Sequence, residues 1–219
     1  MVRLRRRALP DATIARLPQY IRCLSQLENA GVSTVHSAEL AAHVGVSGAV
    51  VRRDLSYVGS YGTRGVGYPV SQLRDEVNRS LGLAGEHPMV VVGVGHLGRA
   101  LAGYAGFGER GLRVVGLFDV DPDLVGSKAA VPHGGFLEIQ PLADIGSCVS
   151  ANQVGIGVIA TPADAAQDVA DRLVRAGVSS ILNLSAVHLE VPHSVAVRPV
   201  DLATEIQILA VHAAGRGRS

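Results

Sequence analysis

The segment VVGVGHLG, residues 91–98, carries the strongest structural signal in the chain, because an apolar run passes directly into the pattern Gly-x-Gly-x-x-Gly. The run at residues 89–94 predicts a buried strand, and residues 96–105 predict the helix that follows it. In this setting the first glycine permits a tight turn, the second lets a pyrophosphate approach the backbone, and the third lets the helix pack closely. The segment therefore predicts a dinucleotide site, with the phosphates at the start of the helix. The candidate contacts are Gly93, Val94, Gly95, His96, Leu97 and Gly98.

A carboxylate follows the next apolar run at the distance that such a site needs. Asp119 ends the run at residues 112–119, 21 residues after Gly98, where it can accept both hydroxyls of an adenosine ribose. Its charge would repel a 2′-phosphate, and no arginine follows within VDPDLVGSK, residues 120–128. The sequence therefore favours NAD(H) over NADP(H). Coenzyme A stays open as another ligand, although its 3′-phosphate would meet the same charge.

The chain after residue 88 alternates apolar runs with helical segments, which indicates an α/β fold with a doubly wound parallel sheet. The expected strands cover residues 89–94, 112–119, 154–160, 180–184 and 195–200, with helices at 96–105 and 163–176. Ligands of such sheets lie at the carboxyl ends of the strands. Further candidate cofactor contacts are Val120, Tyr104, Thr161, Pro162, Asn183 and Ser185. Tyr104 could wall a nicotinamide ring or simply fill the core.

The N-terminal part has the periodicity of helices. Apolar spacings of three and four predict a helix over residues 12–30, which Pro18 either kinks or begins. A short helix capped by Ser37 and a second one from Ser47 to about residue 57 follow, with a turn at Gly45. This order predicts a helix-turn-helix unit. An ordinary helical hairpin is the alternative.

Polar and basic side chains gather on the last of these helices and on the segment after it. A DNA reader needs donors for base edges and phosphates, which Arg52 and Arg53 supply. The glycine-rich segment GSYGTRGVGY, residues 59–68, predicts a hairpin wing with an arginine suited to a narrow minor groove. The candidate DNA contacts are Ser47, Arg52, Arg53, Ser56, Tyr61, Arg64, Gly65 and Tyr68. A solvated basic surface and a flexible loop are the plainer interpretations. Residues 70–81 predict one more helix, and residues 82–88 a linker.

Charge and composition separate the two parts and exclude several classes of protein. Residues 1–88 hold 11 arginines and 7 acids, whereas residues 89–219 hold 9 basic residues and 12 acids, so the front half suits a polyanion. Cys23 and Cys148 stand far apart without metal-ligand spacing, so we expect no zinc site, no disulfide framework and a cytoplasmic location. No long apolar run or signal peptide is evident, so we expect no membrane partner.

Six stretches resemble the redox-sensing transcriptional repressors of the Rex family. They are VRRDLSYVGSYGTRGVGY (51–68), VVGVGHLGRAL (91–101), YAGFGERG (104–111), FDVDPDLVG (118–126), ILNLSAVHLEVP (181–192) and VDLATEIQILA (200–210). The resemblance implies a homodimer with a winged-helix DNA-binding domain at residues 1–84 and a Rossmann NAD(H)-binding domain at 85–200. It also implies a C-terminal helix, within 201–219, that is exchanged between subunits. Such a dimer binds a palindromic operator of TTGTGA type, releases it when NADH binds, and has no catalytic or metal site.

The resemblance also implies a switch, in which Arg22 pairs with Asp201 in one state and Tyr104 engages Asp201 in the other. Leu202 departs from relatives that carry an aromatic residue there. A small NAD-dependent dehydrogenase is the alternative function, although the chain leaves little room for a substrate domain and offers no evident proton-transfer group. A coenzyme A-binding module is a third possibility.

Overall fold

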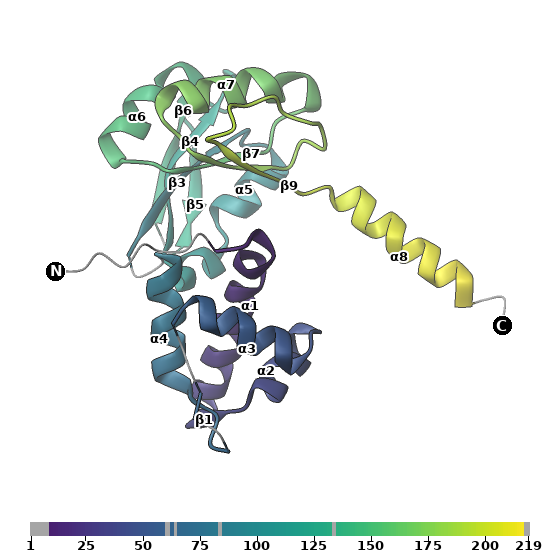
Figure 1. Cartoon of the computed structure of the whole chain (residues 1–219). Coiled ribbons are helices and arrows are strands. Elements are labelled where there is room, and N and C mark those ends of the chain that lie inside the picture. Colours follow the sequence, from purple (N-terminus) through teal and green to yellow (C-terminus); the bar gives the residue numbers. More distant parts are fainter. Residues whose placement is uncertain (1–8, 60–61, 64, 83–84, 133–134, 217–219) are drawn as a thin grey trace. The chain divides into compact units, whose positions relative to one another are not determined.

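The computed structural model describes residues 9–59, 62–63, 65–82, 85–132 and 135–216. The chain divides into two compact units, Met1–Gly85 and Glu86–Ser219. Figure 1 colours the first unit from purple to blue and the second from teal to yellow.

The first unit is built mainly from helices. Its elements are α1 (Asp11–Asn29), β1 (Thr34–Val35), α2 (Ser37–Val44), α3 (Gly48–Tyr57), β2 (Tyr68–Pro69) and α4 (Val70–Leu81). The predicted helices are confirmed, and α1 begins well before Pro18, which therefore lies inside it. The two short strands pair antiparallel, so the segment after α3 returns to the segment before α2.

The turn between α2 and α3 explains how the helix-turn-helix forms. Gly45 ends α2 in the left-handed region, with φ of 71°, which glycine adopts without steric cost. Ser47 caps α3 as predicted, because its Oγ accepts a hydrogen bond from the N–H of Val50 at 3.4 Å. Ser37, the predicted cap of α2, is instead the first residue of the helix. The N-cap is His36, whose N–H donates to the Glu39 carboxylate at 2.7 Å.

A single core joins these helices. Its fully buried members include Leu17 and Leu24 from α1, Leu40 from α2, and Val51 and Leu55 from α3. Because Val51 and Leu55 are four residues apart, they lie on one face of α3 and turn the opposite face outward.

The second unit is a seven-stranded sheet in the order β5-β6-β4-β3-β7-β8-β9. The strands are β3 (His87–Val92), β4 (Leu112–Asp119), β5 (Lys128–Val131), β6 (Gly135–Pro141), β7 (Ile156–Ile159), β8 (Ser180–Asn183) and β9 (Ala196–Pro199). Only β5 runs antiparallel to its neighbour, so the doubly wound parallel sheet is confirmed in its main part. The expected strand at 112–119 is reproduced, whereas β5 and β6 were not anticipated.

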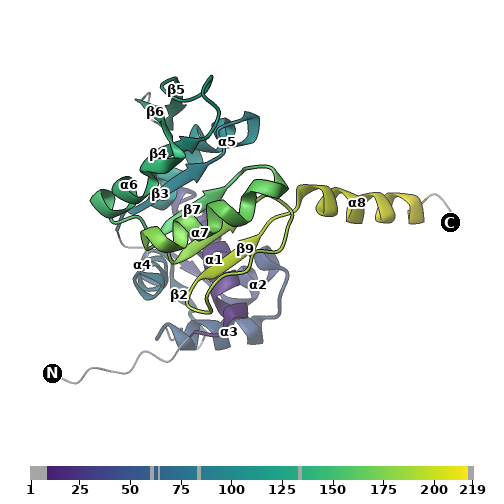
Figure 2. The ribbon, with the colours of Figure 1, turned by 90° about the horizontal axis from the view of Figure 1, so that it is seen from above.

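Helices cover both faces of this sheet. They are α5 (His96–Ala102), α6 (Ile145–Asn152) and α7 (Ala166–Ala176), with a 3₁₀ helix, η1, at Ala105–Arg110. Val90 and Val92 of β3 belong to the core layer under α6 and α7, whereas Val91 belongs to the layer that holds Ala102 of α5. Successive side chains of a strand point to opposite faces, so β3 is buried on both. Figure 2 shows α6 and α7 away from α5 across the sheet.

The last helix, α8 (Leu202–Arg216), presents apolar side chains to solvent in the single chain. Ile206, Leu209 and Val211 are 66%, 65% and 72% exposed. The exchange of this helix between subunits stays a prediction. No helix in the described part of the chain combines the length and the apolar character needed to cross a bilayer.

Candidate functional site

The turn after β3 requires a glycine for steric reasons. Gly93 has φ of 89°, and a Cβ there would lie 2.7 Å from the carbonyl of Ala160, at the end of the neighbouring β7. Side-chain-bearing residues avoid this backbone region, and the close approach excludes even a methyl group. The turn therefore runs tightly against the carboxyl end of β7.

The other two glycines differ from each other in what surrounds them. A Cβ at Gly98 would lie 1.9 Å from the carbonyl oxygen of Gly93, so the first turn of α5 packs directly on the strand-ending turn. A Cβ at Gly95 would meet no atom within 4 Å, and Gly95 precedes α5 without any side-chain cap. The protein's own packing thus explains Gly98, whereas Gly95 borders open space, where a Gly-x-Gly-x-x-Gly turn would receive the phosphates.

Asp119 binds the same turn from the end of β4. Its Oδ2 accepts the N–H of Val94 at 2.6 Å, and its Oδ1 accepts those of Val120 and Asp121 at 2.8 and 3.0 Å. A carboxylate offers about four acceptor positions, so about one stays free for a ribose hydroxyl. The carboxylate therefore holds the glycine turn in place, and its contact with both ribose hydroxyls stays a prediction.

A hydroxyl without a partner lies beside this turn. The Oγ1 of Thr161 is buried and makes no hydrogen bond within the described residues. Its residue follows β7, and its backbone N would lie 2.8 Å from a Cβ on Gly93. An unpaired buried hydroxyl is unfavourable, so this atom suits a bound polar ligand. Pro162, the next residue, is exposed.

Asn183 and Ser185, the candidates after β8, use their polar groups within their own loop. The Oδ1 of buried Asn183 accepts the Ser185 N–H at 3.0 Å and its hydroxyl at 2.5 Å. The Asn183 amide donates to the Val187 carbonyl at 2.7 Å. These bonds explain both residue types without a ligand, so their cofactor contact stays a prediction.

Several apolar side chains stand exposed in the segments that follow β3 and β4 along the chain. Leu97, Tyr104 and Val120 are 40%, 51% and 75% exposed, and His96 is exposed as well. Because half of its surface is exposed, Tyr104 does not fill the core, although its ring meets Phe107 edge-on with the centroids 5.1 Å apart. Such side chains provide surface on which the flat rings of a dinucleotide can pack.

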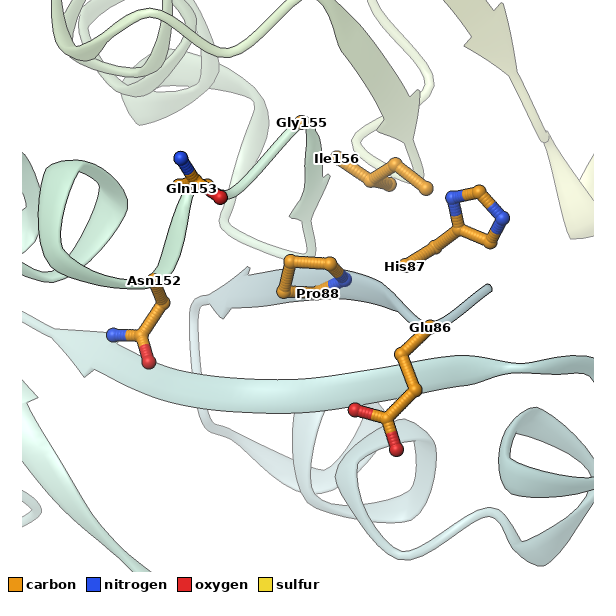
Figure 3. Close-up of a pocket in the computed structure, with 7 residues that line it drawn as sticks. All are labelled: Glu86, His87, Pro88, Asn152, Gln153, Gly155 and Ile156. Atoms are coloured by element: carbon orange, nitrogen blue, oxygen red, sulfur yellow. The ribbon is translucent and has the colours of Figure 1, made fainter. Parts of the chain in front are cut away.

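A hollow of about 280 Å³ lies at the opposite end of the strands from the glycine turn. Figure 3 shows its lining, which consists of Glu86, His87, Pro88, Asn152, Gln153, Gly155 and Ile156. Because β3 begins at His87 and β7 begins at Ile156, the hollow borders the amino ends of these strands. It is therefore separate from the glycine turn, which follows the carboxyl ends.

The outer face of α3 carries the predicted DNA contacts. Arg52, Arg53 and Ser56 are exposed, whereas Val51 and Leu55 are buried. The Arg52 guanidinium donates to the hydroxyl of Ser37 at 3.0 Å. Ser47 accepts its capping bond, and Ser56 donates to the Arg53 carbonyl at 2.7 Å, so both hydroxyls already have partners.

The wing is described only in part, and Tyr61 and Arg64 lie outside the described residues. Thr63 pairs with Gly67 in an antiparallel bridge, and Gly65 adopts φ of 81° in the turn between them. Tyr68 is only 7% exposed, and a Cβ on Gly62 would lie 2.8 Å from its ring. The ring of Tyr68 therefore packs in the core of the first unit, and its expected contact with DNA stays a prediction.

Sequence reasoning missed a buried carboxylate on the inner face of α3. Asp54 is fully buried and accepts hydrogen bonds from the Thr13 hydroxyl at 2.8 Å and the Tyr20 hydroxyl at 2.9 Å. The Arg16 guanidinium binds both carboxylate oxygens, through Nε at 2.6 Å and Nη2 at 2.8 Å. The sequence held one signal of this burial, because Asp54 stands between Val51 and Leu55, which form the apolar face of the predicted helix.

The electrostatics of this cluster favour the charged pair. Burial alone raises the pKa of Asp54, but the hydrogen bonds from Arg16, Thr13 and Tyr20 outweigh it, and the pKa lies below its ordinary value. The hydrogen bond to Asp54 raises the pKa of Arg16. Burial and the same carboxylate raise the pKa of the Tyr20 hydroxyl. Asp54 is therefore an anion at neutral pH.

The predicted switch residues lie on three elements. Arg22 is exposed on α1, Tyr104 precedes η1, and Asp201 caps α8 by accepting the N–H groups of Ala203 and Thr204 at 3.0 and 3.2 Å. Hydrogen bonds from Thr204 lower the pKa of Asp201. Arg22 belongs to the first unit and Asp201 to the second, so their pairing stays a prediction.

Metal and thiol chemistry have little basis in the described residues. No group of His, Cys, Asp and Glu there has the arrangement of a metal site. Cys23 and Cys148 are free thiols, and burial raises the pKa of both, which makes each a weaker nucleophile at neutral pH.

A helix-turn-helix unit followed by a dinucleotide-type α/β unit defines the class of ligand-responsive transcription regulators. Two family models match this chain: "Putative DNA-binding protein N-terminus" over residues 8–56 and "CoA binding domain" over residues 85–187. The redox-sensing transcriptional repressor Rex of Streptomyces avermitilis is 52% identical over 95% of this chain and 81% of its own. The chain belongs to the Rex family of redox-sensing transcriptional repressors, which confirms the resemblance seen in the sequence.

Solved structures agree with this assignment. A crystal structure of RSP in complex with beta-NAD+ and operator DNA matches with a TM-score of 0.86 and 32% identity, over 96% of this chain and 95% of that one. A structure of RSP with beta-NADH matches with a TM-score of 0.82 and 31% identity, over 96% and 97%. The similarity therefore extends through both units.

Proposed function

We propose that this chain represses transcription by binding operator DNA and that NADH releases it from the DNA. The observation that carries this proposal is the similarity, along almost the whole chain, to a repressor solved both with beta-NAD+ on operator DNA and with beta-NADH. One domain would then bind the nucleotide and the other the DNA. The boundary proposed for these roles is the one expected from the sequence, after residue 84.

The glycine turn is the proposed nucleotide site. The open space at Gly95 would take the pyrophosphate, the unpartnered hydroxyl of Thr161 would bind a polar atom of the ligand, and Asp119 would accept a ribose hydroxyl. Asp119 disfavours a 2′-phosphate by charge repulsion, which supports NAD(H) over NADP(H). NADH carries an uncharged nicotinamide and NAD⁺ a positive one, so an apolar, closed pocket desolvates the reduced form at lower cost.

The outer face of α3 is the proposed base-reading surface. Arg52 and Arg53 would donate to base edges and phosphates in the major groove, with Arg64 in the wing contributing through the minor groove. A palindromic operator requires two such helices related by a two-fold axis, so the active species would be a homodimer. The exposed apolar face of α8 would supply subunit contacts.

We propose no catalytic role and a cytoplasmic location, where a repressor meets its DNA. The relatives are transcriptional repressors, and this does not favour a dehydrogenase. Coenzyme A has one specific observation in its favour, the "CoA binding domain" model over residues 85–187. Its 3′-phosphate would meet the carboxylate of Asp119, so we rank it below NADH.

Fluorescence polarisation with a labelled palindromic duplex tests the proposal. The protein is titrated at fixed salt, because phosphate contacts make the affinity salt-dependent. NADH, NAD⁺ and coenzyme A are then added separately, with a scrambled duplex as the control. We expect operator-selective binding that NADH abolishes and coenzyme A leaves unchanged. Operator binding that does not change when NADH is added would contradict the proposed redox response. Absence of DNA binding would contradict the proposed repressor function.

A further inference from the structure

We infer that Asp54 is a positioning residue for DNA recognition, which fixes the rotation of α3 on α1 and thereby aims the arginines of the outer face. The inference rests on the proposed DNA-binding function and extends it to a residue that touches no DNA. Asp54 is the immediate neighbour of Arg53 on α3, yet its carboxylate is fully buried whereas Arg53 is exposed.

One face of α1 is arranged around this carboxylate. Thr13, Arg16 and Tyr20 are spaced by three and four residues, so they lie along a single stripe of the helix. All three donate to Asp54, and together they supply four hydrogen bonds of 2.6 to 2.9 Å. A carboxylate offers about four acceptor positions, so its capacity is filled by one neighbouring helix.

Directional bonds of this kind constrain α3 more closely than apolar packing does. Val51 and Leu55 already attach α3 to the core, and apolar contacts tolerate small rotations because they have no preferred direction. The two parallel bonds from Arg16 hold the carboxylate in one plane. Buried ion pairs often add little stability compared with apolar residues of similar size, and their better-attested use is to fix register.

The rotation of α3 matters because its outer arginine side chains are long, so a small rotation of the helix displaces their guanidinium groups more than it displaces the backbone. Successive residues of a helix are separated by about 100°, so a turn of α3 about its axis moves Arg53 and Arg52 across the groove together. Bidentate contacts to bases require close alignment, whereas phosphate contacts tolerate displacement. A loosened α3 should therefore lose discrimination between DNA sequences more than it loses general DNA affinity.

The test compares Asp54→Asn with Glu28→Gln in the full-length protein. Glu28 also lies on α1 and forms an ion pair, with Arg74 of α4, but this pair does not involve α3. Both variants exchange a carboxylate for an amide, so they match chemically. The readout is the ratio of affinities for the operator and for a scrambled duplex, measured below the unfolding temperature alongside NADH binding.

We expect Asp54→Asn to lower the operator-to-scrambled ratio by about tenfold, while NADH affinity and the Glu28→Gln ratio stay at wild-type values. If Asp54→Asn fails to fold, Arg16→Lys gives the answer, because lysine keeps the charge but loses the two-pronged geometry. There we expect the ratio to fall several-fold, and Arg16→Gln should not restore it.

The outcomes separate the inference from the proposed function. A folded Asp54→Asn or Arg16→Lys protein with the wild-type ratio would overturn the positioning role and leave the repressor function intact. An equal fall in the Glu28→Gln variant would also overturn it, since any weakened α1 contact would then suffice. A wild-type protein that does not prefer the operator would contradict the proposed function itself.

Discussion

The glycine turn and the α1–α3 contact differ in how fully their polar groups are satisfied. At the glycine turn, the hydroxyl of Thr161 is buried without a partner and the space at Gly95 is open. Between α1 and α3, every acceptor position of Asp54 is used. The difference indicates that the proposed ligand site keeps hydrogen-bonding capacity in reserve, whereas the proposed DNA-reading surface is held by hydrogen bonds that are completed beneath it.

The largest effect should come from Gly98→Ala, which tests whether the turn is built as tightly as its geometry indicates. A Cβ at this position would lie 1.9 Å from the Gly93 carbonyl oxygen, and backbone cannot move aside cheaply. We expect a loss of about 3 kcal/mol of unfolding free energy and no measurable NADH binding. Gly95→Ala is the control, since it should weaken NADH binding without changing the unfolding temperature. Similar stability losses in both variants would contradict the different roles of the two glycines.

The second effect concerns acid stability and sharpens the account of Asp54. Because the folded-state pKa of Asp54 lies below its ordinary value of 3.8, its contribution is present above that pH and is lost as the pH falls through the folded pKa. We expect Asp54→Asn to cost about 1.5–3 kcal/mol at pH 7, the value of a hydrogen bond to a charged group, and less below pH 4. Denaturant unfolding at both pH values measures this. An equal cost at pH 7 and pH 3 would argue against a buried anion.

The third effect tests whether the two units work separately. Arg52→Ala should weaken operator binding by about 1–3 kcal/mol, since its guanidinium is exposed on α3, and should leave NADH affinity unchanged. Polarisation for DNA and nucleotide fluorescence for NADH give the two values. Equal losses of operator affinity and NADH affinity would contradict the assignment of DNA binding and nucleotide binding to separate units.

The smallest effect tests the reserve of bonding capacity at Thr161. Thr161→Val removes a buried hydroxyl that has no hydrogen-bond partner among the residues that the structure describes, so stability should stay constant or rise slightly. NADH affinity should fall by about 1 kcal/mol, because the ligand loses a hydrogen bond. Calorimetry of NADH binding, paired with thermal unfolding, checks both signs. A stability loss with unchanged NADH affinity would show that the hydroxyl serves the fold.

The sequence predicted those parts of the fold that follow from periodicity and turn chemistry. The helices of the first unit and strand β4 appear where apolar spacing, Ser47 and Gly45 indicated. Strands β5 and β6 were missed because Lys128, Glu138 and Gln140 interrupt any apolar run in them, and because β5 is a short strand at the edge of the sheet.

The site was predicted less completely than the fold, because its decisive contacts join residues far apart in the chain. The glycine pattern identified the turn, but Asp119 holding Val94 across 25 residues is visible only in three dimensions. Asp54 meets partners 34 to 41 residues away, and an acid between two buried positions of a helix gives only a weak hint of them. Tyr68 illustrates a further gap, since its burial in the core could not be read from its place in the wing, and its DNA contact stays a prediction.

Linkage between the two ligands tests the central claim most directly. If NADH and operator DNA compete through one conformational equilibrium, then NADH must weaken operator binding by the same factor by which the operator weakens NADH binding. We propose to titrate NADH with and without saturating operator, and operator with and without saturating NADH, at one salt concentration. The two factors must be equal by linkage, and the account predicts that each ligand weakens the binding of the other by a factor of about 5 to 150. An NADH affinity that does not change when the operator is bound would contradict it.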